Sequence, residues 1–175
     1  MKKNLQIPSN LIPYFRTNHA GETGAVYIYK AILYVSKNED IVNFATNHLK
    51  TESEHLKLIE NILEKRHRSK LIFIWKIAGF ATGLIPSLFS KKFVFATIFY
   101  VESFVEKHYQ EQIDMLDSKS KNTELKKFLQ KLQDDEISHK DEAILEAPKF
   151  SYFHKIWGQI VGMGSAFAVK ISMYI

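Results

Sequence analysis

Two short stretches, Glu52-Ser-Glu-His55 and Glu136-Ile-Ser-His139, each place a glutamate and a histidine three residues apart in a segment of helical periodicity. Residues i and i+3 lie on one helix face about a turn apart, so both side chains can reach one metal pair. Two single glutamates, Glu22 and Glu102, alternate in chain order with these units. Four-helix bundles hold two iron or manganese ions with this set: one glutamate from each of two helices and one Glu-x-x-His from each of the others.

One Glu-x-x-His unit alone would carry little information, because exposed glutamates and histidines are common on helix surfaces. Two units that alternate with single acidic residues are much harder to obtain by chance. The pattern therefore favours a metal-binding bundle over solvated helix faces.

Apolar periodicity, breakers and capping residues predict an all-α chain, and strand signals are nearly absent. Asn122 or Thr123 is expected to cap one helix, and Pro148 to follow its end. Five main helices are expected, at residues 18–36, 39–65, 91–116, 122–146 and 152–174.

The segment 71–89, LIFIWKIAGFATGLIPSLF, carries a single charge at Lys76 and has basic residues on both sides. It could cross a membrane, form a buried core hairpin, or lie in the membrane interface as a broken helix that dips and returns. Gly79, Gly83 and Pro86 interrupt its regularity, and two basic ends suit insertion better than spanning, so we favour the interfacial hairpin. Residues 150–175 are expected to add a C-terminal amphipathic helix whose aromatic face supports the same interpretation.

Composition narrows the function classes. The 175 residues suit a single domain, 1–175, and the lack of cysteine excludes thiolate-bound zinc and iron–sulfur clusters. The N-terminus has no apolar segment typical of a secretory signal. The net charge of +5 suits an acidic partner, but no nucleic-acid-binding pattern occurs, so anionic lipid is the better candidate.

The stretch Asn18-His-Ala-Gly-Glu22-Thr-Gly-Ala25 resembles the Asn-His-Ala-Gly-Glu-x-Gly-Ala signature of the demethoxyubiquinone hydroxylases, ferritin-like di-iron monooxygenases of ubiquinone biosynthesis. The resemblance continues through Arg16, the two Glu-x-x-His units, Val101-Glu102-Ser and His108-Tyr109, and covers about residues 14–173. The chain departs from the family in its last residues, Lys170-Ile-Ser-Met-Tyr-Ile175, and at Ser103, where members often carry a second glutamate. Neither departure touches an expected ligand.

We expect one metal to be held chiefly by Glu22, Glu52 and His55 and the other chiefly by Glu102, Glu136 and His139, with some glutamates bridging. Asp135 is a candidate hydrogen-bond partner for one of the histidines, or simply an exposed acid. The resemblance places His108 and Tyr109 near the substrate and the electron path. From its spacing alone Tyr109 shares a face with Glu102 and can point to the metals, although a lone tyrosine so placed is more often core.

Three functions remain open: hydroxylation of a demethoxyubiquinone ring, ferritin-like iron handling, and quinone or lipid binding by a silent subunit. The apolar segment and the complete ligand set favour the enzyme. The resemblance then implies two iron ions, O2 and the quinone as reactants, and NADH or another electron donor. It also implies a peripheral position on the cytoplasmic face of a bacterial membrane or the equivalent organelle membrane, as a homo-oligomer or with other proteins of the pathway.

Overall fold

The computed structural model describes residues 5–117 and 122–175, and these residues form helices and connecting loops without a strand. The all-α expectation is confirmed. Two 3-10 turns, η1 (Ser9–Leu11) and η2 (Lys65–His67), accompany six α-helices. The α-helices are α1 (Ile12–Val35), α2 (Glu39–Ile62), α3 (Ile72–Ser87), α4 (Lys91–Asp117), α5 (Thr123–Glu146) and α6 (Tyr152–Ser172).

Helix ends follow local sequence signals. The side chain of Asn38 accepts a hydrogen bond from the backbone N–H of Ile41 (3.2 Å) at the start of α2, and Asn122 caps α5 in the same way. Such caps stabilise a helix by about 1 kcal/mol. The first helix begins six residues earlier than we expected, at Ile12, because Pro13 occupies its first turn, where a missing N–H costs nothing.

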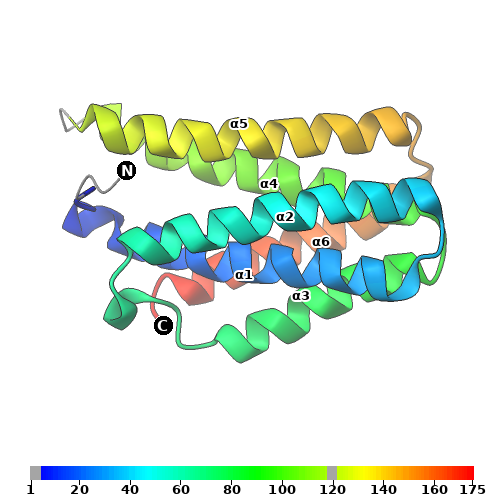
Figure 1. The fold of residues 1–175 in the computed structure, drawn as a ribbon, viewed down its shortest axis with the longest axis horizontal. Helices are drawn as coiled ribbons and strands as arrows, with labels where there is room; N and C mark the ends of the chain where they lie inside the picture. Colours follow the sequence, from blue (N-terminus) through cyan, green and yellow to red (C-terminus); the bar gives the residue numbers. More distant parts are fainter. Residues whose placement is uncertain (1–4, 118–121) are drawn as a thin grey trace.

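The helices lie roughly side by side along the long axis of the molecule (Figure 1). Helix α1 packs against α2, and α4 packs against α5, which gives the two helix pairs of a four-helix bundle. Outside this bundle α3 packs mainly against α1, and α6 against α4 and α1. The bundle is consistent with a ferritin-like arrangement.

Two apolar clusters fill the bundle at different levels. One contains Tyr29, Ile32, Phe44 and Phe95, and the other contains Phe15 together with residues of α2, α4 and α5 such as Ile59 and Leu129. The expected metal ligands fall between these clusters in the sequence of every bundle helix: Glu22 between Phe15 and Tyr29, for example. The fold therefore buries a layer of polar side chains between two apolar layers.

Residues 71–89 do not form the broken hairpin that we expected. They contain one continuous helix, α3, in which Gly79 and Gly83 are buried against α1. A β-carbon at Gly79 would lie 2.2 Å from the carbonyl oxygen of Gly24, and one at Gly83 would lie 2.2 Å from that of Ile28. The glycines thus permit close helix contact rather than breaking the helix, and Pro86 lies in the last turn, where the helix ends anyway.

The outer faces of α3 and α6 expose a set of large apolar side chains. We call this set the apolar face: Phe73, Ile74, Ile77, Ile85, Tyr152, Phe153, Ile156, Ile160, Met163 and Phe167. The one charge of α3, Lys76, instead lies 5.5 Å from the centre of the Tyr27 ring, and Trp75 is buried and donates to Ser69 Oγ (2.8 Å). Within the described residues no helix combines the length and apolarity needed to cross a membrane.

Candidate metal centre

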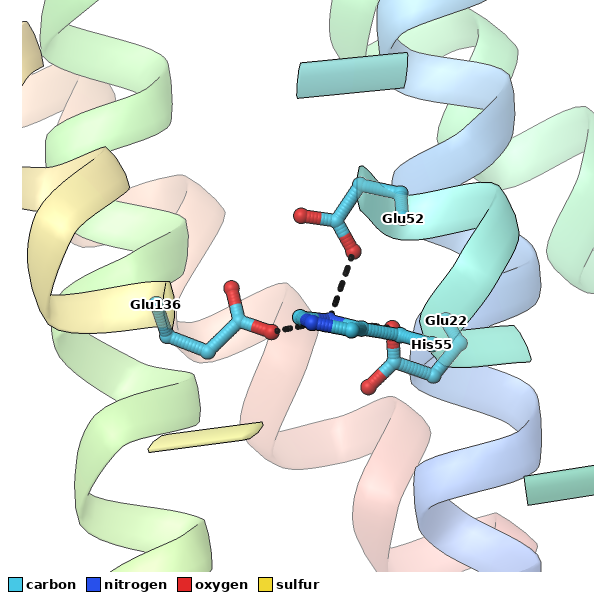
Figure 2. Close-up of side chains that lie close together, drawn as sticks. All are labelled: Glu22, Glu52, His55 and Glu136. Carbon is cyan, nitrogen blue, oxygen red and sulfur yellow. Dashed lines mark hydrogen bonds and ion pairs between the residues drawn. The ribbon is translucent and has the colours of Figure 1, made fainter. Parts of the chain in front are cut away.

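All six residues that the sequence pattern selected are buried and lie in the layer between the two apolar clusters. The first group comprises Glu22, Glu52, His55 and Glu136, from α1, α2 and α5, and Figure 2 shows their side chains pointing toward one another. Nδ1 of His55 lies 3.1 Å from Glu136, 3.7 Å from Glu22 and 3.8 Å from Glu52. These distances let one ion contact all four side chains.

The second group comprises Glu52, Glu102, Glu136 and His139. Nδ1 of His139 lies 3.0 Å from Oε1 of Glu52 and 3.5 Å from Oε2 of Glu136. Glu52 and Glu136 belong to both groups, whereas each histidine and each single glutamate belongs to one. The geometry therefore suits two ions with the two Glu-x-x-His glutamates between them.

The donor atoms are chemically incomplete without a cation. No well-aligned hydrogen bond satisfies either carboxylate oxygen of Glu52, one of Glu22, one of Glu136, or Nδ1 of His139, although Nδ1 of His139 lies 3.0 Å from Oε1 of Glu52. Unpaired buried polar atoms are rare in folded proteins because each loses its hydration without compensation. Carboxylate and imidazole donors suit iron or manganese. The residues present thus fit a two-metal centre.

The same crowding shifts the proton affinities of the metal-free site. Burial raises the pKa of Glu52 and of Glu102 well above the usual range, and the neighbouring Glu136 raises both further. Burial by itself would lower the pKa of His55, but the hydrogen bond to Glu136 and the nearby carboxylates of Glu22 and Glu52 raise this pKa to about 12. The carboxylates around His139 raise its pKa to about 11, although burial by itself would lower that pKa. Protons therefore occupy the site when cations do not.

Two tyrosines donate hydrogen bonds to the single glutamates, and each tyrosine bonds to the glutamate on the other helix. Tyr109 of α4 donates a hydrogen bond to Glu22 of α1, while Tyr29 of α1 donates to Glu102 of α4 (3.1 Å). Burial raises the pKa of both phenols well above the usual value, so both remain donors. Tyr29 was missing from our sequence-based set. It lies seven residues after Glu22, the spacing that separates Tyr109 from Glu102, and this repeat could have revealed it.

Outer hydrogen bonds hold the histidines. Nε2 of His55 donates to Asp135 (3.0 Å), which leaves Nδ1 directed at the carboxylates. The ring of His48 lies 4.0 Å from that of His139, and its Nε2 donates to Glu142 (2.9 Å). Such partners fix ring orientation and tautomer at metal sites. His48 thus lies between the ring of His139 and Glu142, whose side chain is half-exposed.

His108 lies away from the two metal-capable groups. Its ring stacks between Tyr14 (5.9 Å) and Phe104 (6.2 Å), and Nε2 lies 2.6 Å from the hydroxyl of Thr17. Because that hydroxyl donates to the carbonyl of Tyr14 (2.6 Å), Nε2 is the donor to Thr17. Burial lowers the pKa of His108 to about 4, so the ring is neutral at pH 7.

A cavity of about 510 Å³ connects this site with the surface. Its inner end is formed by Glu22, Glu52, Glu102, Glu136 and Tyr109, and His108 also lies in its wall. The remaining wall is mostly apolar and comes from α1, α3, α4 and α6. Among the lining residues Ile74 of α3 and Ile160 and Phe167 of α6 are exposed, so the cavity opens between α3 and α6, on the apolar face.

Comparison with known proteins identifies the family. The model of the family described as "Ubiquinone biosynthesis protein COQ7" matches residues 10–172. The chain is 32% identical over 160 residues to the NADPH-dependent 3-demethoxyubiquinone 3-hydroxylase of Dictyostelium discoideum, covering 90% of this chain and 74% of that protein. It is 30% identical to the enzyme of the same name from Caenorhabditis elegans (78% and 77% covered) and 27% identical to the 3-demethoxyubiquinol 3-hydroxylase of Rhodospirillum rubrum (94% and 79% covered). The chain belongs to the COQ7 family.

Proposed function

We propose that this chain hydroxylates the ring of a demethoxyubiquinone in ubiquinone biosynthesis, with a di-iron centre in the bundle. The observation that carries the proposal is the junction of two features: two buried carboxylate–histidine groups, and an apolar cavity that runs from them to the apolar face. The names of the relatives from Dictyostelium discoideum and Rhodospirillum rubrum state the same reaction class for those proteins.

One iron would be held by Glu22 and His55 and the other by Glu102 and His139, with Glu52 and Glu136 shared. Four carboxylates balance the charge of two divalent cations, which makes burial of the whole cluster tolerable. Reduced iron at this position would react with dioxygen and supply the oxidising power for hydroxylation.

The surrounding residues bind and orient. The apolar cavity wall takes the substrate ring and excludes bulk water, which strengthens every electrostatic interaction inside the site. Tyr109 and Tyr29 hold the two single glutamates, and Asp135 holds His55. Neutral His108 presents a fixed edge to the cavity because Thr17 anchors Nε2.

The substrate is expected to enter from a membrane. Ubiquinone precursors carry long apolar tails, and the cavity opens on the apolar face of α3 and α6. Lys65 and Lys70 before α3, and Lys155 on α6, are exposed and available to acidic headgroups. This arrangement suits a protein that lies on the cytoplasmic face of a bacterial membrane or on the equivalent organelle membrane, where it could also contact other proteins of the pathway.

Electrons must come from outside the chain, since the ligands and the apolar wall offer no reductant. The names of the relatives from Dictyostelium discoideum and Caenorhabditis elegans specify NADPH. A reduced nicotinamide nucleotide, acting directly or through a carrier, is accordingly the proposed donor for this chain.

Isotope labelling tests the proposal. Purified protein loaded with reduced iron is mixed with a short-tailed demethoxyubiquinone and labelled O2, and we expect a product heavier by one labelled oxygen atom. Glu102→Ala should abolish turnover because it removes a ligand that only one metal group contains. Rapid iron oxidation with mineral deposition and no quinone product would support an iron-handling protein instead. Bound iron and bound quinone without turnover would support a silent binding subunit.

A further inference from the structure

The last residue of α6, Ser172, is held firmly and is completely buried (0% exposed). The guanidinium group of Arg16 in α1 donates to the backbone carbonyl of the next residue, Met173 (3.0 Å), and also to the carbonyl of His67 (3.0 Å). One side chain therefore joins the start of α1, the turn η2 and the end of α6. The end of α6 is thus fixed where helices usually fray.

The hydroxyl of Ser172 nevertheless has no hydrogen-bond partner. Serines in helices usually donate to the carbonyl four residues earlier. In this chain Ser87, Ser103 and Ser165 do so, at 2.7, 2.6 and 3.2 Å. A buried hydroxyl without a partner is unfavourable, so a specific function is the natural explanation.

Ser172 lines the same cavity that leads to the metal centre. Apart from the proposed ligands, every other polar side chain among the described residues of the cavity wall already has a partner. These side chains are Thr17, Asn18, Trp75, Thr82, His108, Tyr109, Trp157 and Ser165. Among the described residues of this wall, Ser172 therefore has the one hydroxyl without a hydrogen-bond partner.

The position of Ser172 within the cavity follows from the Arg16 contact. Arg16 lies in the second turn of α1, so its bond to Met173 places the end of α6 beside this first part of α1. Glu22 follows Arg16 by six residues, which corresponds to about 9 Å along α1. That length is comparable with a substituted six-membered ring, so one molecule could contact the hydroxyl and extend toward the carboxylates.

We infer that the hydroxyl of Ser172 donates a hydrogen bond to an oxygen substituent on the ring of the substrate and thereby orients the ring in the cavity. This inference rests on the proposed function, which supplies a ring with carbonyl and methoxy oxygens. The apolar tail of such a molecule cannot use a hydroxyl group, and apolar contacts alone do not distinguish one edge of a ring from another. Ser172 thus selects an oxygen-bearing ring and sets which edge faces inward.

Binding to the metal-free protein tests the inference separately from turnover. Two probes are compared: a short-tailed demethoxyubiquinone, and the same alkyl-substituted ring without its oxygens. Ser172→Ala should weaken binding of the quinone about tenfold, or about 1.4 kcal/mol, and leave binding of the oxygen-free ring unchanged. Ser172→Thr keeps the hydroxyl and should restore most of the quinone affinity. Ser87→Ala is the control, because it removes a helical hydroxyl that is already bonded to Gly83 and that lies outside the cavity wall.

Each outcome discriminates. Equal quinone affinity in wild type and Ser172→Ala, while the iron-loaded wild type hydroxylates the quinone, would overturn the role of Ser172 and leave the proposed function intact. Loss of affinity for both probes in Ser172→Ala would also overturn it, because the change would then act through the shape of the cavity. A wild type that binds the quinone but forms no labelled product would contradict the proposed function instead.

Discussion

The close packing of α3 against α1 gives a quantitative prediction. Gly79→Ala would place a methyl carbon 2.2 Å from the carbonyl oxygen of Gly24, whereas carbon and carbonyl oxygen normally stay about 3.3 Å apart or more. Backbone cannot rotate away as a flexible side chain can, so α3 must retreat by roughly 1 Å. Overpacking of this kind costs about 1–3 kcal/mol, against a gain of up to about 1 kcal/mol from replacing glycine within a helix.

With the full gain subtracted, the net loss is up to about 2 kcal/mol and should lower the melting temperature of Gly79→Ala by up to about 8 °C, since each kcal/mol shifts it by about 2–4 °C in a chain of this size. Gly162→Ala, within α6, is the control of opposite sign: its β-carbon would have no neighbour within 4 Å. It should melt slightly higher than the wild type because the helix gains propensity without a clash. Thermal unfolding followed by circular dichroism measures both. A Gly79→Ala protein as stable as Gly162→Ala would refute the close contact between α1 and α3.

Three further outcomes are expected. Divalent metal binding near pH 7 should release protons and become tighter as the pH rises, because burial keeps Glu52 protonated and carboxylates keep His55 protonated in the metal-free site. Calorimetry in buffers of different ionisation enthalpy measures the protons released, and metal binding without proton release would contradict the prediction. Replacing the exposed Phe73 and Ile74 with serine should release the protein from anionic liposomes in a flotation assay, because apolar surface that the membrane would bury is removed. Complete release of the wild type by salt alone would instead show that the attachment is purely electrostatic. Tyr109→Phe should slow turnover with two irons per chain retained, since it removes a hydrogen bond to a ligand but no ligand; loss of iron would assign the tyrosine to metal retention.

The sequence was most informative where periodicity and chemistry coincide. Glu52 with His55, and Glu136 with His139, could be selected because a helix brings residues three apart to one face, and the structure places all four in the same layer. The cap at Asn122 was predicted for a similarly local reason. Which glutamates are shared between the two groups depends on how four helices meet, and no local pattern contains that information.

Long-range contacts explain the errors. Gly79 and Gly83 resemble helix breakers in a sequence, yet their role depends on the backbone of α1, which lies more than 50 residues earlier in the chain. Trp75 belongs to the segment that we expected to enter the membrane interface, yet it turns inward because Ser69 accepts its N–H. Ser172 gave no signal at all, since its free hydroxyl becomes visible only when burial and every other partner in the cavity are known.

The crossed contacts at the site follow from the repeated order of glutamate and Glu-x-x-His along the chain. Seven residues span about 10.5 Å of helix, so a tyrosine seven positions after a glutamate lies two turns away from it on the same face. The hydroxyls of Tyr29 and Tyr109 instead reach the glutamates of the facing helices, Glu102 and Glu22. The two Glu-x-x-His units are crossed in the same way, with Nδ1 of each histidine 3.0–3.1 Å from the glutamate of the other unit. Each half of the bundle therefore completes the other, so neither helix pair can assemble the centre alone.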